Sequence, residues 1–169
     1  MKHSYELVLD NISLKPLCSD DIELLRKWRN DSSNTKFLKK IPFISKEKQI
    51  SWFNSYLSNS DELCFGIHEI AINNRLVGSC SLYNFSEDSC FFGKLLIGEK
   101  TAHGKNLGRN ATNAAVKIAF ECLKLKCVFL YVYEDNIGAI KVYKECGFNV
   151  CSKQVLSNGK TEYLMVTYK

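Results

Sequence analysis

Gly104 and Gly108 stand four residues apart in the stretch HGKNLGRNA, residues 103–111. Lys105 and Arg109 add positive charge beside these glycines, and an alanine-rich segment with helical spacing follows at once. Backbone N–H groups at a helix N-terminus lack partners within the helix, and the helix dipole is positive there. Small residues at that position let a pyrophosphate approach these groups closely. The spacing indicates either such an anion-binding loop or a simple turn before a helix.

Two better-known phosphate loops do not fit this stretch. A Walker loop has lysine directly after its last glycine, whereas Arg109 follows Gly108, and a dinucleotide loop has a third glycine. A second group of residues lies downstream, where Asn136 and Tyr143 are seven residues apart and share one face of a predicted helix. Asn136 alone would be a helix cap and Tyr143 alone a core aromatic. Together with the loop, they indicate a site.

The elements that must position these residues follow from the hydrophobic periodicity. The pattern predicts strands over residues 5–17, 63–72, 75–85, 89–98, 127–133, 148–156 and 161–168. It predicts helices from Ser19 to near Asn30, from Ser45 to about Leu57, from the glycine loop to Cys122, and over 136–147. Tight hairpin turns are expected at Asn73-Asn74 and at Asn158-Gly159.

The resulting order, β-α-α-β-β-β-α-β-α-β-β, predicts a mixed α/β (α+β) fold with one central sheet. The apolar run CVFLYVY, residues 127–133, is expected to be a central strand that is buried on both faces. No repeat or Pro/Gly-rich linker divides the 169 residues, so we expect a single domain over 1–169.

Composition excludes several other classes of protein. No apolar run approaches the length of a membrane span, and the start MKHSYELVLD lacks the apolar core of a signal peptide. We therefore expect a cytoplasmic protein without membrane contact. The net charge of +5 is compatible with a small anionic ligand, and no basic block or zinc finger points to nucleic acid. Eight cysteines without CxxC spacing are expected to be mostly buried, reduced thiols, with no metal site.

From about Gly93 to Phe148 the chain resembles the GNAT family of acetyl-CoA-dependent N-acetyltransferases. The stretches KLLIGEK, HGKNLGRNA and LYVYEDNIGAIKVYKECGF carry the resemblance, and the predicted order of elements agrees with the GNAT fold over the whole chain. The resemblance implies transfer of an acetyl group from acetyl-CoA to a primary amine, by direct attack in a ternary complex and without a metal.

The resemblance also implies a part for individual residues. Backbone amides of one loop would hold the cofactor pyrophosphate: His103, Gly104, Lys105, Asn106, Leu107, Gly108 and Arg109. Leu95 and Ile97 would bond the pantetheine arm and the thioester carbonyl through their backbones. Asn136 would contact the cofactor arm. Tyr143 would be the catalytic general acid that protonates the leaving thiolate.

Two departures from the family pattern bear on this chemistry. The family loop reads (Q/R)xxGx(G/A), and His103 and Asn106 replace its first and fourth letters; asparagine tolerates the left-handed conformation better than most residues. Phe92 stands where many relatives carry a glutamate as general base, and a phenyl ring cannot take a proton. Another group, or an amine that arrives neutral, could replace the base. A water chain is a third alternative, through Glu134, Tyr131 or Ser79 and Ser81.

The stretch WRNDSSNTKFLKKIPFIS, residues 28–45, is the candidate acceptor segment. Its aromatic and cationic residues are Trp28, Phe37 and Phe43 and Arg29, Lys36, Lys39 and Lys40. That mixture suits a nucleotide-linked substrate, and it also fits a solvated loop with buried aromatics. The elements RN, NT and FIS, with KNxG in the loop, resemble the GNAT enzymes of the pseudaminic-acid pathway, which acetylate a 4-amino sugar on UDP. We therefore expect Arg29, Asn30, Phe37 and Ser79 to bind such a sugar nucleotide.

Other acceptors stay open at this point. The ending NGKTEYLMVTY resembles the last hairpin of ribosomal-protein N-terminal and polyamine acetyltransferases. A polyamine site needs clustered carboxylates, and those near the first helix are mostly explained by capping. A catalytically degenerate CoA-binding module is the alternative of another class, because Phe92 replaces the base; Tyr143 argues for an enzyme. By analogy with such folds, the last two strands are a candidate homodimer surface.

Overall fold

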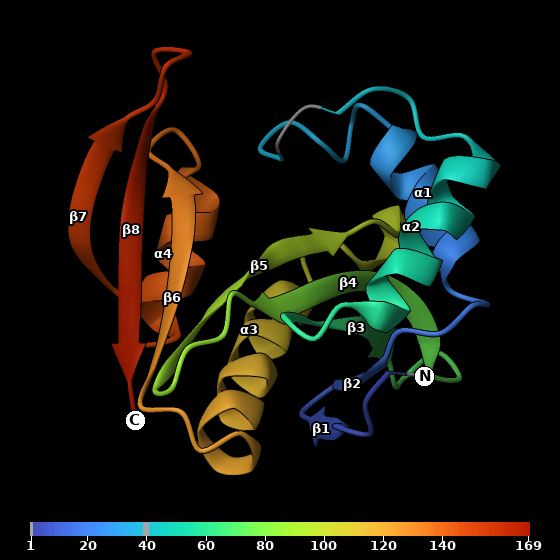
Figure 1. Cartoon of the computed structure of the whole chain (residues 1–169), viewed down its shortest axis with the longest axis horizontal. Helices are drawn as coiled ribbons and strands as arrows, with labels where there is room; N and C mark the ends of the chain where they lie inside the picture. Colours follow the sequence, from blue (N-terminus) through green and yellow to red (C-terminus); the bar gives the residue numbers. More distant parts are fainter. Residues whose placement is uncertain (1, 39–40) are drawn as a thin grey trace.

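The computed structural model describes residues 2–38 and 41–169, and it confirms a mixed α/β fold built on one sheet. The eight strands lie in the order β1-β2-β3-β4-β5-β6-β8-β7 (Figure 1). Their bounds are β1 Leu7–Leu9, β2 Ile12–Pro16, β3 Glu62–Glu69, β4 Arg75–Tyr83, β5 Ser89–Ile97, β6 Cys127–Tyr133, β7 Asn149–Val155 and β8 Thr161–Tyr168. The helices are α1 Ile22–Asn30, α2 Lys46–Ser58, α3 Leu107–Lys117 and α4 Ile137–Glu145, with a 3₁₀ turn η1 at Lys100–Ala102 and a π-helical turn η2 at Ile118–Cys122.

The helices cover the sheet in two separate cores. Alternate residues of one strand enter different cores: Phe65 of β3 packs in the core under α3 and α4, whereas Cys64 packs with α1 and α2. Leu76 and Val77 of β4 divide in the same way. Because successive strand residues point to opposite faces, α1 and α2 lie on the face of the sheet opposite α3 and α4.

The prediction of one continuous strand over residues 5–17 is wrong. This segment forms two short strands, β1 and β2, paired antiparallel with Leu7 opposite Leu14. The turn between them contains Asp10, whose φ of 51° lies in the left-handed region that Asp and Asn tolerate. Asp10-Asn11 was therefore a turn signal within an otherwise strand-like pattern.

Strand β6 also departs from the prediction, because only one of its faces is buried. Val128, Leu130 and Val132 point into the core, while Tyr131 on the opposite face is 46% exposed. The large aromatic side chains of this strand therefore make the apolar run look more buried than it is.

The predicted helix boundaries hold except at the start of the first helix, and the third reaches Cys122 as predicted but with a π-helical last turn. Ser45 caps α2 by accepting a hydrogen bond from the Lys48 N–H, at 3.3 Å. The first helix begins at Ile22 rather than Ser19, because the Asp21 carboxylate accepts from the Cys18 N–H and forms a turn there. The helix after the glycine loop continues past Lys117 as the η2 turn.

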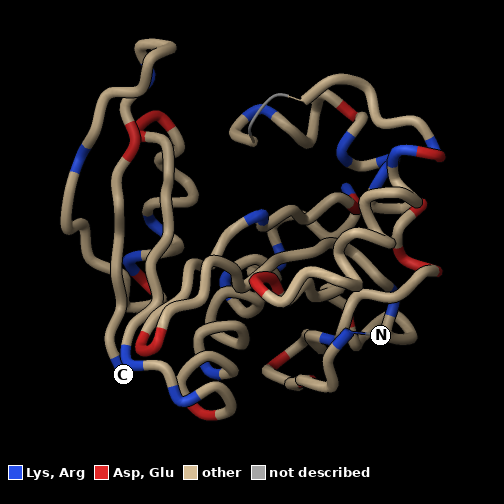
Figure 2. Tube along the Cα trace, in the orientation of Figure 1, with Lys and Arg blue, Asp and Glu red and all other residues tan. Residues whose placement is uncertain are grey.

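The charged residues are interleaved along the chain rather than gathered in one segment (Figure 2). All eight cysteines are free; most are at least partly buried, but the prediction of buried thiols is wrong for Cys122 and Cys151, which are exposed. In the described part of the chain, no helix has the length and apolar character needed to cross a membrane.

Gly98 lets α1 rest on the end of β5. A Cβ atom at this position would lie 2.2 Å from the Trp28 ring, which is itself 8% exposed. We expect Gly98→Ala to lower the free energy of unfolding by about 1–3 kcal/mol, because the indole must shift within a packed core. Chemical denaturation measures this. Gly138→Ala, in open space on α4, is the control and should be neutral or stabilising; equal effects of the two would contradict the steric account.

Candidate active site

A bulge in β5 shapes the site. The register between β4 and β5 shifts between Gly93 and Leu96, where β5 carries one residue more than β4. Lys94 lies in this shift with a φ of 53°, a conformation rare for lysine. A bulge bends its strand and disrupts the ladder locally. Here the second half of β5 turns away from β6, while its pairing with β4 resumes at Leu96 and Ile97.

Strands β5 and β6 consequently part. They pair in parallel only through residues 89–91 and 127–129, and then diverge (Figure 1). A cavity of about 1050 Å³ opens at the divergence. Its lining includes Gly93–Ile97 of β5, Tyr131–Tyr133 of β6, and Asn136, Ala139 and Tyr143 of α4. An open cleft with exposed strand backbone suits a long, flexible ligand that hydrogen-bonds to main-chain groups.

Helix α4 presents Asn136 and Tyr143 on one face, as their spacing predicts. Both line the cleft, with Ala139 between them. The Asn136 Oδ1 atom accepts a hydrogen bond from the Ala139 N–H at 3.3 Å, so this residue also caps the helix. Asn136 therefore both caps α4 and forms part of the cleft wall.

Tyr143 is held by two phenyl rings. It is 8% exposed, meets Phe92 edge-on at 6.3 Å between ring centroids, and lies 6.1 Å from Phe148. Burial raises the pKa of the Tyr143 hydroxyl well above its ordinary value, so the group stays protonated. Such a hydroxyl can donate a proton but cannot serve as a base at neutral pH. Phe92 is fully buried and positions this ring.

The glycine loop has the conformation of an anion-binding turn. Gly104 and Asn106 adopt left-handed φ values of 77° and 60°, and the first helical bond of α3 runs from the Asn110 N–H to the Asn106 carbonyl. Within residues 2–38 and 41–169, no hydrogen bond is donated by a backbone amide of 104–109. Free amides of this kind attract phosphate oxygens.

The loop abuts the cleft. A Cβ atom at Gly108 would lie 3.8 Å from the side chains of Leu95 and Ile97. His103 Nε2 lies 2.8 Å from the Ile97 carbonyl oxygen, and because that oxygen can only accept, Nε2 is the donor. The residue that departs from the family loop therefore fastens the loop to β5, and the roles predicted for Leu95 and Ile97 toward the cofactor stay predictions.

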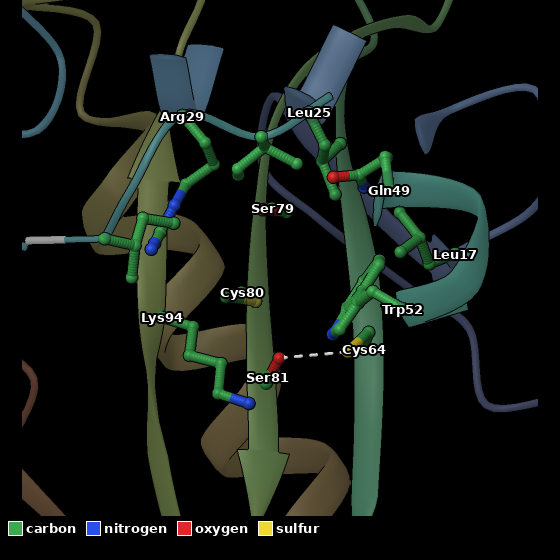
Figure 3. Close-up of a pocket in the computed structure, with 12 residues that line it drawn as sticks. Leu17, Leu25, Arg29, Gln49, Trp52, Cys64, Ser79, Cys80, Ser81 and Lys94 are labelled. Atoms are coloured by element: carbon green, nitrogen blue, oxygen red, sulfur yellow. Dashed lines mark hydrogen bonds between the residues drawn. The ribbon is translucent and has the colours of Figure 1, made fainter. Parts of the chain in front are cut away.

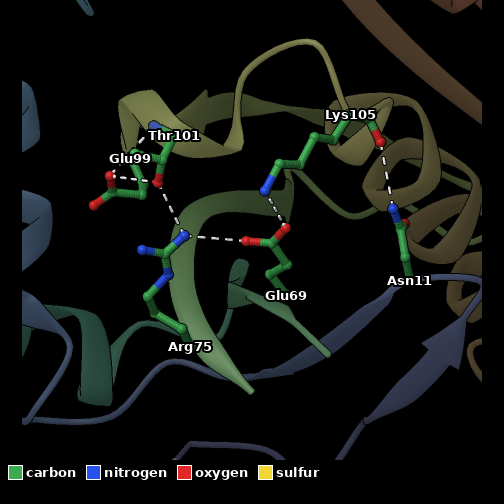
Figure 4. A network of polar contacts seen from close by, with 6 residues as sticks. All are labelled: Asn11, Glu69, Arg75, Glu99, Thr101 and Lys105. Carbon is green, nitrogen blue, oxygen red and sulfur yellow. Dashed lines mark hydrogen bonds and ion pairs between the residues drawn. The ribbon is translucent and has the colours of Figure 1, made fainter. Parts of the chain in front are cut away.

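A polar network holds the loop from the side of the β3–β4 hairpin (Figure 4). The buried Glu69 carboxylate binds Lys105 Nζ at 2.7 Å and Arg75 Nη2 at 3.1 Å. Arg75 also donates to Thr101 Oγ1 at 3.0 Å, and Thr101 donates to Glu99. The Lys105 charge is thus already paired, and its side chain anchors the loop.

Two asparagines also support the glycine loop, and the sequence analysis did not identify them. Asn11, in the β1–β2 turn, donates to the Lys105 carbonyl at 3.3 Å and accepts from Asn110 Nδ2 at 2.8 Å. The pair is 99 residues apart along the chain, so no local pattern connects it. Arg109 lies 3.6 Å from Glu145 and ties α3 to α4.

A second cavity of about 340 Å³ lies between α1, α2 and strands β3 to β5 (Figure 3). Its apolar lining is Leu17, Leu25, Ile41, Ile44, Trp52, Cys64 and Cys80, and its polar lining is Arg29, Gln49, Ser79, Ser81 and Lys94. Arg29, Ile41 and Lys94 line both cavities, so the two meet there. A cofactor arm in the cleft and an acceptor in the smaller cavity would therefore come together beside Lys94.

The predicted acceptor residues separate into three groups. Arg29 and Ser79 line the smaller cavity, and Phe37 lines the cleft. Asn30 lines neither; its amide makes two hydrogen bonds of 2.9 Å with the backbone of Ile44 and so positions that wall. Phe43 is 71% exposed. Lys39 and Lys40 lie outside the described residues.

Two further lining residues escaped the sequence analysis. Trp52 stacks on Tyr56 with ring centroids 5.8 Å apart and an interplanar angle of 14°. It is 37% exposed and lines the smaller cavity. Lys94 gave no signal, because its sequence neighbours read as an ordinary strand. Of the proposed water-chain residues, Ser79 and Ser81 line the smaller cavity and Tyr131 lines the cleft.

Comparison with known proteins decides the family. Residues 11–149 match the model of an acetyltransferase (GNAT) domain. The chain belongs to the GNAT acetyltransferase family. It is therefore an acetyl-CoA-dependent enzyme that transfers an acetyl group to an amine. The free amides of the glycine loop and the open β5 backbone fit acetyl-CoA, which supplies an acyl group activated on sulfur.

Individual relatives agree with this assignment. The chain is 29% identical over 134 residues to an acetyltransferase PseH of Campylobacter jejuni, covering 79% of this chain and 80% of the relative. It is 24% identical over 139 residues to a spermidine N(1)-acetyltransferase of Vibrio cholerae, covering 81% and 78%. A crystal structure of the spermidine N-acetyltransferase from Vibrio cholerae with CoA and spermine has a TM-score of 0.84 at 21% identity, over 94% and 95% of the chains.

The Glu69 network should make the free energy of unfolding depend on pH. The hydrogen bond from Lys105 holds the pKa of Glu69 below its ordinary 4.5, and Arg75 adds to this against the effect of burial. The stabilisation is therefore complete above pH 4.5 and is lost as the pH falls through the lowered value. We expect Glu69→Gln to lower the free energy of unfolding at pH 7 by about 1–3 kcal/mol and to weaken acetyl-CoA binding.

Denaturation at several pH values and calorimetric titration with acetyl-CoA measure both effects. Glu121→Gln removes the same charge from an exposed pair with Lys117 and should change stability by less than about 0.5 kcal/mol. A Glu69→Gln effect of the same size at pH 7 and at pH 3 would contradict the ion-pair account.

Proposed function

We propose that this enzyme acetylates the 4-amino group of a UDP-linked amino sugar, by direct attack on acetyl-CoA in a ternary complex. The observation that carries the proposal is the charge of the acceptor cavity. Its described lining includes two cations, Arg29 and Lys94, and no carboxylate. A diphosphate is recognised by such cations, whereas a polyamine is recognised by carboxylates.

The rest of the cavity is consistent with a nucleotide sugar. Trp52 is partly exposed and lines the cavity, and aromatic rings of this kind stack on nucleobases. Phe37 offers a second ring in the neighbouring cleft, with Lys36 Nζ 4.9 Å from its centroid. The apolar side chains from α1 and α2 suit the carbon face of a deoxy sugar.

Arg29 is the residue we assign to the diphosphate. Burial lowers the pKa of its guanidinium, which nonetheless stays charged as guanidinium groups in proteins do. It makes no hydrogen bond or ion pair with any side chain in the described ranges, so its donors are available to a ligand. Partial burial removes some of the water that hydrates the guanidinium. A charge-assisted, bidentate contact to phosphate would compensate for that lost hydration.

The cofactor residues keep the roles that the family resemblance implies. In the proposal, the loop amides of residues 104–109 bind the pyrophosphate, whereas the His103 N–H already donates to the Lys100 carbonyl. Leu95 and Ile97 bond the pantetheine arm through their backbones, and Asn136 contacts that arm. Tyr143 donates its hydroxyl proton to the departing sulfur. The protonated state of the buried phenol supports this assignment.

Thiol release with purified protein and acetyl-CoA tests the acceptor. The panel contains a UDP-4-amino-4,6-dideoxy sugar, spermidine and short ribosomal N-terminal peptides. We expect kcat/KM to be highest for the sugar nucleotide by at least about a hundredfold, because only this acceptor supplies an anion to the partly buried Arg29. Faster turnover of spermidine or a peptide would discard the proposed acceptor and leave the family assignment intact.

The role of Tyr143 makes a separate prediction. Tyr143→Phe keeps the packed ring and removes the proton donor, so kcat should fall about 10²–10⁴-fold while acetyl-CoA affinity is unchanged. Steady-state kinetics and calorimetric titration separate the two quantities. Tyr168→Phe, at an exposed phenol, is the matched control. Unchanged kcat in the Tyr143 variant would remove it from the mechanism.

A further inference from the structure

Lys94 occupies a backbone position that does not favour lysine. Its φ of 53° places it in the left-handed region, where a Cβ atom is strained and glycine or asparagine is preferred. Strained positions of this kind persist only where the surrounding structure enforces them, and they cluster at functional sites. We therefore looked for the function of the Lys94 side chain in its contacts.

The Lys94 side chain is fixed by a buried carboxylate. Its Nζ lies 2.5 Å from Glu62 Oε1 and 5.3 Å from the centre of the Tyr83 ring. Half of the Lys94 side chain is exposed, at 49%, against 9% for Glu62. Burial alone would raise the pKa of Glu62, but the hydrogen bond and charge of Lys94 outweigh it and lower that pKa, so the carboxylate stays ionised.

This arrangement turns a cation toward the acceptor. Lys94 lines both cavities, whereas Glu62 is absent from the lining of either. In Figure 3 the Lys94 side chain extends along the cavity floor toward Ser81. An acceptor in the cavity therefore meets the ammonium and not the carboxylate behind it.

Glu162 of β8 is the one carboxylate in the described lining of the two cavities, and it lines only the cleft. Arg29 of α1 is a second cation at the same junction. Cys64 of β3 and Tyr83 of β4 are neutral, because burial raises the pKa of both groups. Arg29 therefore supplies a net positive charge at the meeting point of the two cavities, and the Lys94–Glu62 pair adds a dipole whose positive end faces them.

A positive field acts on the acceptor amine. It disfavours the ammonium form and so favours the neutral amine, which is the form that attacks a thioester. This matters in a site where the fully buried Phe92 offers no base. The same field repels acceptors that carry additional ammonium groups.

We propose that Lys94, held in place by Glu62, is the specificity-determining residue of the acceptor site: it admits the acceptor amine in its neutral form and excludes polycationic amines. The inference rests on the proposed placement of the acceptor in the smaller cavity but not on the sugar nucleotide. The two proposals can therefore fail separately.

Three charge states of the cavity wall test this inference. In the wild-type protein the cation faces the cavity; Lys94→Met exposes the Glu62 carboxylate; and Lys94→Met combined with Glu62→Gln leaves a neutral wall of similar volume. For each we would measure kcat/KM with acetyl-CoA for spermidine and for octylamine, a monoamine of similar length. We expect the spermidine-to-octylamine ratio to rise about tenfold or more in Lys94→Met, with the double variant between it and the wild type.

The controls separate charge from structure. Lys94→Arg keeps the cation and should keep the wild-type ratio, and Lys126→Met removes an exposed lysine paired with Asp88 and should leave it unchanged. The double variant keeps the test valid if Lys94→Met fails to fold around an unpaired carboxylate. A wild-type ratio equal to or above that of the double variant overturns the proposal. So does the absence of spermidine turnover in folded variants that still bind acetyl-CoA.

Discussion

One additional residue in β5 is the constraint on which the site depends. Because β5 exceeds β4 by one residue between Gly93 and Leu96, the strand bends and stops pairing with β6 after residue 91. The bend creates the cleft and leaves strand backbone available to a ligand. It also places Lys94 where the cleft meets the acceptor cavity. Cofactor binding and acceptor choice thus follow from one local irregularity of the sheet.

Parts of the chain that contact no ligand keep this opening in place. Glu69 of the β3–β4 hairpin and Asn11 of the β1–β2 turn hold the glycine loop through Lys105, and Asn11 also binds Asn110 of α3. His103 joins the same loop to the end of β5. Since a loop without such supports would lose ordering entropy on binding a pyrophosphate, these contacts preorganise it.

The sequence predicts the parts of the site that depend on local spacing. Two glycines before a helix, and Asn136 with Tyr143 on one helical face, were recognisable because helix geometry is regular; their chemical roles came from the family resemblance. The bulge at Lys94 was not recognisable, because backbone φ leaves no mark in a strand pattern. Glu69 and Asn11 act on residues 36 and 94 positions away, so only the folded chain shows their function.

Amide hydrogen exchange with and without CoA tests the central claim most directly. If the parting of β5 and β6 creates the cofactor site, CoA should protect the amides of residues 93–97 and 104–109 together, because residues 93–97 line the cleft and the adjoining loop residues 104–109 have free N–H groups. The exchange rates of the amides in α1 and α2, which border the smaller cavity, should change little. Protection confined to α1 and α2, with residues 93–97 and 104–109 unaltered at saturating CoA, would contradict the account.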